Sequence, residues 1–119
     1  MGYMMHHAII FDSWDAEAVQ KAVAKAKELG MTVLGPSPRG INGHSSAMIC
    51  PDGSKEGWHE SKVGDEARDA FVEWTKTIGY EDGSSSLHWA EVCFGGDEPD
   101  LNTKVLRYYG QGGFKEEDE

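Results

Sequence analysis

Two segments of the chain place apolar residues three or four positions apart, which is the spacing of one face of an α-helix. In residues 14–29 the apolar positions are Val19, Ala22, Val23, Ala26 and Leu29. In residues 64–78 they are Ala67, Ala70, Phe71, Trp74 and Ile78. Each segment is followed directly by a glycine, which is a common helix stop. The pattern therefore predicts two amphipathic helices.

Four shorter segments are rich in strand-forming residues and end at turn-forming ones. They are residues 5–11 (MHHAIIF), 31–34 (MTVL), 44–50 (HSSAMIC) and 87–94 (LHWAEVCF). Asn42-Gly43 is a hairpin signal, so we expect the second and third strands to be antiparallel neighbours. The two prolines at 36 and 38 lengthen that connection. In residues 54–63 the apolar positions do not recur at a regular spacing, which predicts a turn or a short irregular helix.

The order β-α-β-β-α-β predicts an α+β fold, the ferredoxin-like split βαβ sandwich. Two helices then cover one face of a four-stranded antiparallel sheet, with the first and third strands at its centre. Residues 1–113 form one domain, and an extra strand at 103–109 extends the sheet or crosses to a second subunit. Residues 114–119 are expected to be an acidic disordered tail. The expected core is Ile9 or Ile10, Val23, Ile49, Phe71, Trp74 and Val92.

The charge of the chain argues against one class of partner. With 11 basic and 21 acidic residues the formal net charge is −10, which opposes binding to a nucleic-acid backbone. No signal peptide and no apolar run long enough to span a membrane is present in the sequence, so we expect no membrane partner and a cytoplasmic location. Cys50 and Cys93 both lie in apolar strands and are interpreted as buried free thiols.

Catalytic signatures are weak. His6 and His7 point to opposite faces of one strand, so they cannot jointly hold one metal ion. His88 could share the open face with one of them, the one arrangement that would support metal or acid–base chemistry. The serines lack a nucleophile elbow, and the glycines do not have the spacing of a phosphate loop. We therefore predict no catalytic residue, no metal and no cofactor.

A polar stretch in the middle of the chain is the candidate ligand site. Arg39 and Lys55 flank it, two serines lie between them, and Arg68 begins the second helix, so together they could bind phosphate. Two tryptophans, Trp14 and Trp58, are placed to stack on a planar ligand. The full predicted ligand site is Arg39, Asn42, His44, Ser45, Ser46, Lys55, Trp58 and Arg68. The alternative location is the sheet face carrying His88 and Trp89.

The segments NGHSS, PDGSKEGWHES, GDEARDAFVEW and EDGSSSLHWAEV resemble small uncharacterised proteins encoded by bacteriophages and prophages. The resemblance covers residues 5 to 95. It implies a virus-encoded protein of the host cytoplasm, in a size class that includes many counter-defence factors. It assigns no role to any residue.

Three functions are compatible with these observations. The leading hypothesis is a non-enzymatic phage protein that binds a small anionic ligand, such as a cyclic nucleotide or an ADP-ribose derivative, and so sequesters a host immune signal. The first alternative is an acidic DNA-mimic inhibitor of a host nuclease or CRISPR effector, that is, a host defence protein as partner. The second is a small enzyme that uses His6, His7 or His88, with or without a metal. A homo-oligomer is expected because two helices leave the other sheet face uncovered.

Overall fold

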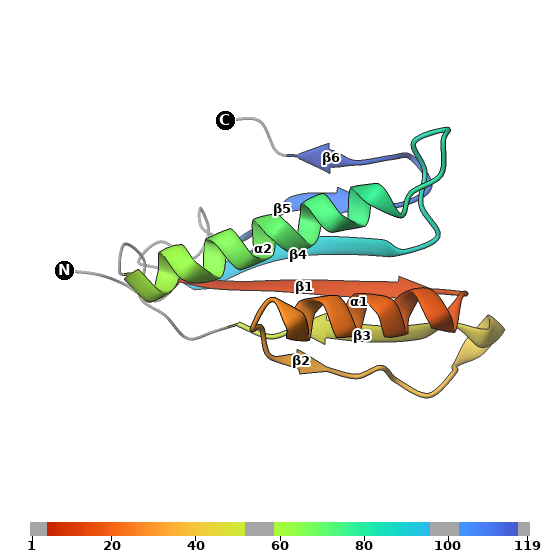
Figure 1. Cartoon of the computed structure of the whole chain (residues 1–119), viewed down its shortest axis with the longest axis horizontal. Coiled ribbons are helices and arrows are strands. Elements are labelled where there is room, and N and C mark those ends of the chain that lie inside the picture. Colours follow the sequence, from red (N-terminus) through yellow and green to blue (C-terminus); the bar gives the residue numbers. More distant parts are fainter. Residues whose placement is uncertain (1–4, 52–58, 96–102, 117–119) are drawn as a thin grey trace.

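The computed structural model describes residues 5–51, 59–95 and 103–116. Within these ranges there are two α-helices and six strands, and Figure 1 shows both helices on the same side of the sheet. The elements are β1 (Met5–Ser13), α1 (Ala16–Glu28), β2 (Val33–Leu34), β3 (Ser45–Ile49), α2 (His59–Thr77), β4 (His88–Gly95), β5 (Lys104–Tyr109) and β6 (Lys115–Glu116). A short 3₁₀ helix, Ile41–Gly43, precedes β3.

The strands form one antiparallel sheet in the order β2-β3-β1-β4-β5-β6. The first four of these strands have the ferredoxin-like arrangement, which confirms the predicted fold class and the central positions of β1 and β3. The predicted strand at 103–109 extends the sheet within the same chain, as β5. The sheet has one more strand than expected, because Lys115 and Glu116, at the start of the predicted tail, pair with β5 as β6.

Several element boundaries differ from the sequence-based expectation. β1 continues through Ser13, and Asp15 caps α1 by accepting a 3.1 Å hydrogen bond from the Glu17 amide. Helix α2 begins at His59, earlier than the predicted residue 64. Asn42 has a φ of 60° within the 3₁₀ helix that ends a long connection, so Asn42-Gly43 does not form the predicted hairpin turn. The two prolines, at 36 and 38, lie in that connection, where they cannot donate ladder hydrogen bonds.

The core lies between the helices and one face of the sheet. Cross-strand pairing aligns Ala47, Phe11, Trp89 and Tyr109 in one row on that face. All four are buried, and Phe11 packs against Phe71 of α2 at 5.7 Å between ring centres. The predicted core residues Ile9, Val23, Ile49 and Phe71 are buried as expected.

Two core predictions need correction, those of Trp74 and Val92. Of the alternatives Ile9 and Ile10, the structure buries Ile9 and leaves Ile10 50% exposed. Trp74 is only partly buried against the core. Val92 lies on the face away from the helices, because its neighbour Glu91 faces them. The two cysteines are free thiols as expected, with Cys93 buried and Cys50 partly exposed. No helix in the described ranges is both long and apolar enough to cross a bilayer.

Candidate ligand-binding site

The face of the sheet that the helices leave uncovered, here called the open face, is largely apolar. Pairing across all six strands aligns Leu34, Met48, Ile10, Ala90, Tyr108 and Lys115 in one row on it. Ile10, Leu34 and Tyr108 are each at least half exposed. A surface of this kind is unusual on a monomer and indicates a site of interaction.

One end of the open face is hollowed into a groove of about 600 Å³. Its floor is the apolar part of the row just described, Ile10, Ala90 and Tyr108. Asp12, His88 and Lys115 supply charged or polar groups, and the loop 110–113 forms a wall. Mostly apolar hollows with a few converging polar groups are typical of small-molecule sites. This region, which we call the open-face groove, lies at the right-hand end of the sheet in Figure 1, where β1 ends and β4 begins.

Glycine at position 110 gives the groove its shape. Gly110 follows β5 beside His88, and a Cβ atom built on Gly110 would lie 3.3 Å from the imidazole ring. This is a tight contact, so a side chain at position 110 would require the ring of His88 to shift by a few tenths of an ångström. On the far side of the loop, Gly113 has a φ of +89° and packs against the carbonyl of Gly83. The loop is therefore held between His88 and the turn that precedes β4.

Asp12 is held in place by His44, which enters from the segment before β3. The His44 Nδ1 atom lies 2.9 Å and 3.0 Å from the two carboxylate oxygens of Asp12. A carboxylate accepts hydrogen bonds, so this contact fits a tautomer of His44 with its proton on Nδ1. In that tautomer Nε2 is an acceptor, which is the arrangement of a general base with its orienting acid. Ser46 and His88 flank Asp12 on the neighbouring strands.

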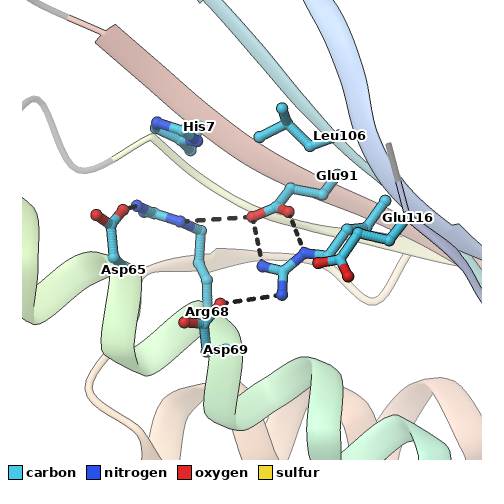
Figure 2. A pocket seen from close by; sticks show the side chains of 8 residues that line it. His7, Asp65, Arg68, Asp69, Glu91, Leu106 and Glu116 are labelled. Carbon is cyan, nitrogen blue, oxygen red and sulfur yellow. Dashed lines mark hydrogen bonds and ion pairs between the residues drawn. The ribbon is translucent and has the colours of Figure 1, made fainter. Parts of the chain in front are cut away.

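A second hollow, of about 250 Å³, lies on the covered face between α2 and the strands β4 and β5. Figure 2 shows two arginines converging there on the carboxylate of Glu91. Arg107 holds it with two bonds, Nε to Oε1 at 2.6 Å and Nη2 to Oε2 at 3.1 Å. Arg68 approaches from α2, with its Nε 3.7 Å from Oε2. We call these three residues, with Asp65 and Asp69, the charge cluster.

A β-bulge builds this second hollow. The register of β4 and β5 shifts between Glu91 and Val92, so that Leu106 is an extra residue in β5. Both Leu106 and Arg107 then line the cavity, although neighbours in a regular strand point to opposite faces. The bulge thus brings a guanidinium and an apolar side chain to the same side of the sheet.

The guanidiniums of the cluster are occupied by acids of the chain itself. The outer nitrogen of Arg107 lies 2.9 Å from Asp69, and Arg68 also pairs with Asp65. Burial alone would lower the pKa of Arg107, but the hydrogen bonds and negative charge of Glu91, together with Asp69, outweigh it and raise that pKa. With Glu116, the cavity has two positive and four negative groups, a net charge of −2 with His7 neutral. The cluster therefore suits a structural clamp better than an anion site.

The structure separates the residues of the predicted ligand site. Arg68 lies in the charge cluster on the covered face, away from the stretch 39–46. Ser45 is buried, and its hydroxyl donates to the Ser37 carbonyl at 2.8 Å. Ser46 is exposed on the open face beside Asp12. The exposed Arg39 and Asn42 lie in the connection before β3, while Lys55 and Trp58 lie outside the described residues.

The structure separates the two residues of the alternative location. His88 does line the open-face groove. Trp89, however, points to the covered face, where it is 3% exposed and its Nε1 donates to Thr75 Oγ1 at 3.1 Å. The two residues are neighbours in a strand, so they lie on opposite faces.

The histidine arrangement proposed from sequence does not form. His6 and His7 do face opposite sides, His6 against Phe94 on the open face and His7 in the cavity of the charge cluster. Along β1, His88 pairs with Asp12, six positions from His6, or about 20 Å at the rise of a strand. Within the described ranges no three His, Cys, Asp or Glu side chains are grouped to hold a metal ion.

Sequence reasoning missed the groove residues within β5 and after it. Tyr108 and Lys115 belong to segments interpreted as an added strand and a tail, and Gln111 lies in the loop between them. The run Gly110-Gln-Gly-Gly113 was the available signal, since it implies a tight backbone approach. Its partner, His88, could not be identified before the register of β4 and β5 was known.

Comparisons with known proteins do not identify a family. No family model matches the chain, and no curated protein matches it. Among the solved structures that align are guanylyl cyclase domains of the RhoGC fusion protein from the aquatic fungus Blastocladiella emersonii. A monomeric double mutant is 12% identical, with a TM-score of 0.35, over 89% of this chain and 68% of that one. Another monomeric domain is 11% identical, with a TM-score of 0.36, over 97% and 98%. TM-scores this low do not establish any relationship between this chain and those domains.

Proposed function

We propose that this chain is a non-enzymatic binding protein whose open-face groove takes a small anionic ligand with a planar ring, such as a nucleotide. The observation that carries the proposal is the combination of an apolar floor with converging polar groups in a hollow of about 600 Å³. Tyr108 offers an exposed ring for stacking, and stacking of a base on an aromatic ring contributes about 1 to 3 kcal/mol.

The polar groups of the groove suit an anion. Lys115 lies in the same cross-strand row as Tyr108 and provides a positive charge beside the ring. His88 and Gln111 add hydrogen-bond donors, and the negative charge of Asp12 is engaged by His44. The overall charge of −10 repels anions from most of the surface. The positive charge and the donors of the groove oppose this repulsion locally.

The biological role proposed from the phage resemblance is sequestration of a host nucleotide signal. Sequestration requires tight binding without turnover. The groove is compatible with binding without turnover, because its apolar floor and its polar groups could hold a ligand without a nucleophile. The proposed role in host defence rests on the phage resemblance, and the proposed class of ligand rests on the groove.

Calorimetry against a panel of mononucleotides, cyclic nucleotides and ADP-ribose derivatives tests the proposal. We expect one member to bind at micromolar or tighter concentration. Tyr108→Ser should weaken that binding about tenfold or more, since it removes the stacking surface. Lys115→Ala should weaken it severalfold, while Arg39→Ala, in the region that the sequence favoured, serves as the matched control and keeps wild-type affinity. Binding weaker than millimolar by every member would reject the proposal.

A row of acids along α2 favours the DNA-mimic alternative. Asp65, Asp69 and Glu73 are four residues apart, so they lie on one side of the helix, and all three are at least half exposed. Each is paired with a cation of the chain, Arg68, Arg107 or Lys76, which reduces the field that a basic partner would meet. We therefore rank mimicry second. Capture of a nuclease from host lysate that is lost at high salt, and lost in Asp65→Asn, would reverse the ranking.

The Asp12–His44 pair favours the enzymatic alternative. Its geometry fits a general base, but in the described part of the chain His44 has no hydrogen bond to a serine hydroxyl. A search for hydrolysis of any bound nucleotide, with His44→Gln as the comparison, decides the question. Turnover that disappears in the variant would replace the binding proposal with an enzymatic one.

A further inference from the structure

A third hollow adjoins the open-face groove. It has a volume of about 360 Å³ and is lined by Trp14, Tyr80 and the serines 84–86. His88 and Gln111 line both this hollow and the open-face groove. The two hollows therefore meet at the same pair of residues. We call the third hollow the Trp14 hollow.

The Trp14 hollow has its own aromatic surface. Trp14 is 58% exposed and Tyr80 is 54% exposed, which is high for rings of this size. The Trp14 ring comes from the short connection between β1 and α1, and Tyr80 from the turn that follows α2. Two backbone hydrogen bonds close this turn: the Tyr80 amide donates to the Ser84 carbonyl at 2.8 Å, and the Gly83 amide donates to the Tyr80 carbonyl at 3.0 Å.

The two hollows thus repeat one chemical arrangement. Each presents an exposed aromatic ring, Tyr108 in the groove and Trp14 in the hollow beside it. Between them lie an imidazole and an amide, His88 and Gln111, both able to donate hydrogen bonds. A ligand that fills both hollows needs a planar group at each end. The part that crosses His88 and Gln111 must accept hydrogen bonds.

We infer that the preferred ligand has two planar rings joined by an anionic linker, which is the chemistry of a dinucleotide. This inference rests on the proposed function, since it extends the ligand from the open-face groove into the Trp14 hollow. One ring stacks on Tyr108 and the other on Trp14 or Tyr80. The phosphate between the rings lies against His88 and Gln111, with Lys115 on the side of the groove.

The test compares a ligand with one ring and a ligand with two rings on the intact chain. AMP carries one adenine, and the dinucleoside monophosphate ApA carries two adenines joined by one phosphate. We expect ApA to bind at least tenfold more tightly than AMP. Trp14 is exposed and lies in the second hollow, so its fluorescence should be quenched by ApA and much less by AMP.

Variants in each hollow separate the two contributions. Trp14→Ser should weaken ApA binding about tenfold and leave AMP binding within twofold. Tyr108→Ser should weaken both ligands. Leu34→Ser is the matched control, because Leu34 is an exposed apolar residue of the same sheet face that lines neither hollow, and it should change neither affinity.

The outcomes distinguish this inference from the proposed function. AMP binding that depends on Tyr108, with ApA no tighter than AMP, would overturn the inference and leave the proposed function standing. Equal loss of AMP and ApA binding in Trp14→Ser would also overturn it, because the hollow would then not be specific for a second ring. If neither AMP, ApA nor any nucleotide of the panel binds, both fail together.

Discussion

The two faces of the sheet come from the same strands, yet their apolar side chains are covered differently. On the covered face, Phe11 and Trp89 are buried beneath α2. On the open face, Ile10 and Tyr108 stand in a comparable cross-strand row and remain half exposed. Residues 8–11 of β1 are all apolar, and successive side chains of a strand point to opposite faces, so both faces carry apolar side chains. A sheet that carries apolar side chains on both faces but helices on one retains a surface for binding.

The faces also differ in how they treat charge. On the covered face, Glu91 is buried and its carboxylate is engaged by Arg107 and Arg68. On the open face, Asp12 and Lys115 border a hollow that is open to solvent. A buried charge needs partners within the chain, whereas an exposed cation such as Lys115 can exchange water for an anionic ligand. This contrast is why we place the ligand in the open-face groove and not in the charge cluster.

The largest expected effect is on the covered face. Phe71→Ala should lower the free energy of unfolding by about 4 to 5 kcal/mol, because Phe71 is fully buried and its removal leaves a cavity. Phe94→Ala is the matched control on the open face, where the ring is 42% exposed, and should cost far less. Urea denaturation measures both. Equal losses would mean that the open face is also covered, by a partner or by another part of the chain.

A slightly smaller loss is expected when the charge cluster is broken. Glu91→Ala should cost about 3 kcal/mol, because it leaves two partly or fully buried guanidiniums without their shared carboxylate. Glu73→Ala removes an exposed acid of α2 and should change stability little. The same denaturation experiment compares them. A loss below about 1 kcal/mol for Glu91→Ala would show that water replaces the carboxylate and that the cavity is open enough to take a ligand.

The helices and the strand order could be predicted from the sequence because both depend on local patterns. Helix α1 follows from the spacing of Val19, Ala22 and Ala26, and the fold follows from the order of the elements. The choice between Ile9 and Ile10 could not be made, since both are equally apolar and only the helices distinguish the two faces. Glu91 was missed as an inward residue because its partners, Arg68 and Arg107, come from distant parts of the chain.

The candidate site was less predictable for the same reason. Asp12, His88 and Lys115 come from three strands, and only the register of those strands brings them together. The central stretch around residue 44 contributed one contact, His44 on Asp12, because a long connection replaced the hairpin that the sequence predicted. A pattern of polar residues along the chain therefore identified a neighbouring region and missed the groove itself.

We expect the chain to self-associate through the end of the open face that lies away from the groove. A substitution there should have an effect intermediate between those above and the last one below. Phe94 and Val105 are exposed there, and Val92 lies between β1 and Val105 in the same face. We expect the intact chain to form a homodimer or a larger oligomer, and Phe94→Ser to weaken it. Light scattering that gives a 13.1 kDa monomer at tens of micromolar would contradict the expectation.

The smallest expected effect lies in the turn beside the Trp14 hollow, outside both faces. The Asp82 carboxylate accepts hydrogen bonds from the Ser84 hydroxyl at 2.6 Å and from the Ser84 amide at 2.9 Å, and these bonds lower the pKa of Asp82 below its usual 3.8. A lowered pKa in the folded state stabilises the fold above pH 3.8, and this contribution is lost as the pH falls through the folded value. Asp82→Asn should therefore lower the melting temperature slightly at neutral pH, and the difference from the wild type should shrink as the pH falls below 3.8.

Glu81→Gln, one residue earlier on the same exposed turn, is the control and should show no such dependence. Melting curves recorded across acidic pH measure the difference, and a gap between Asp82→Asn and the wild type that widens in acid would contradict the assignment of these bonds to the ionised carboxylate.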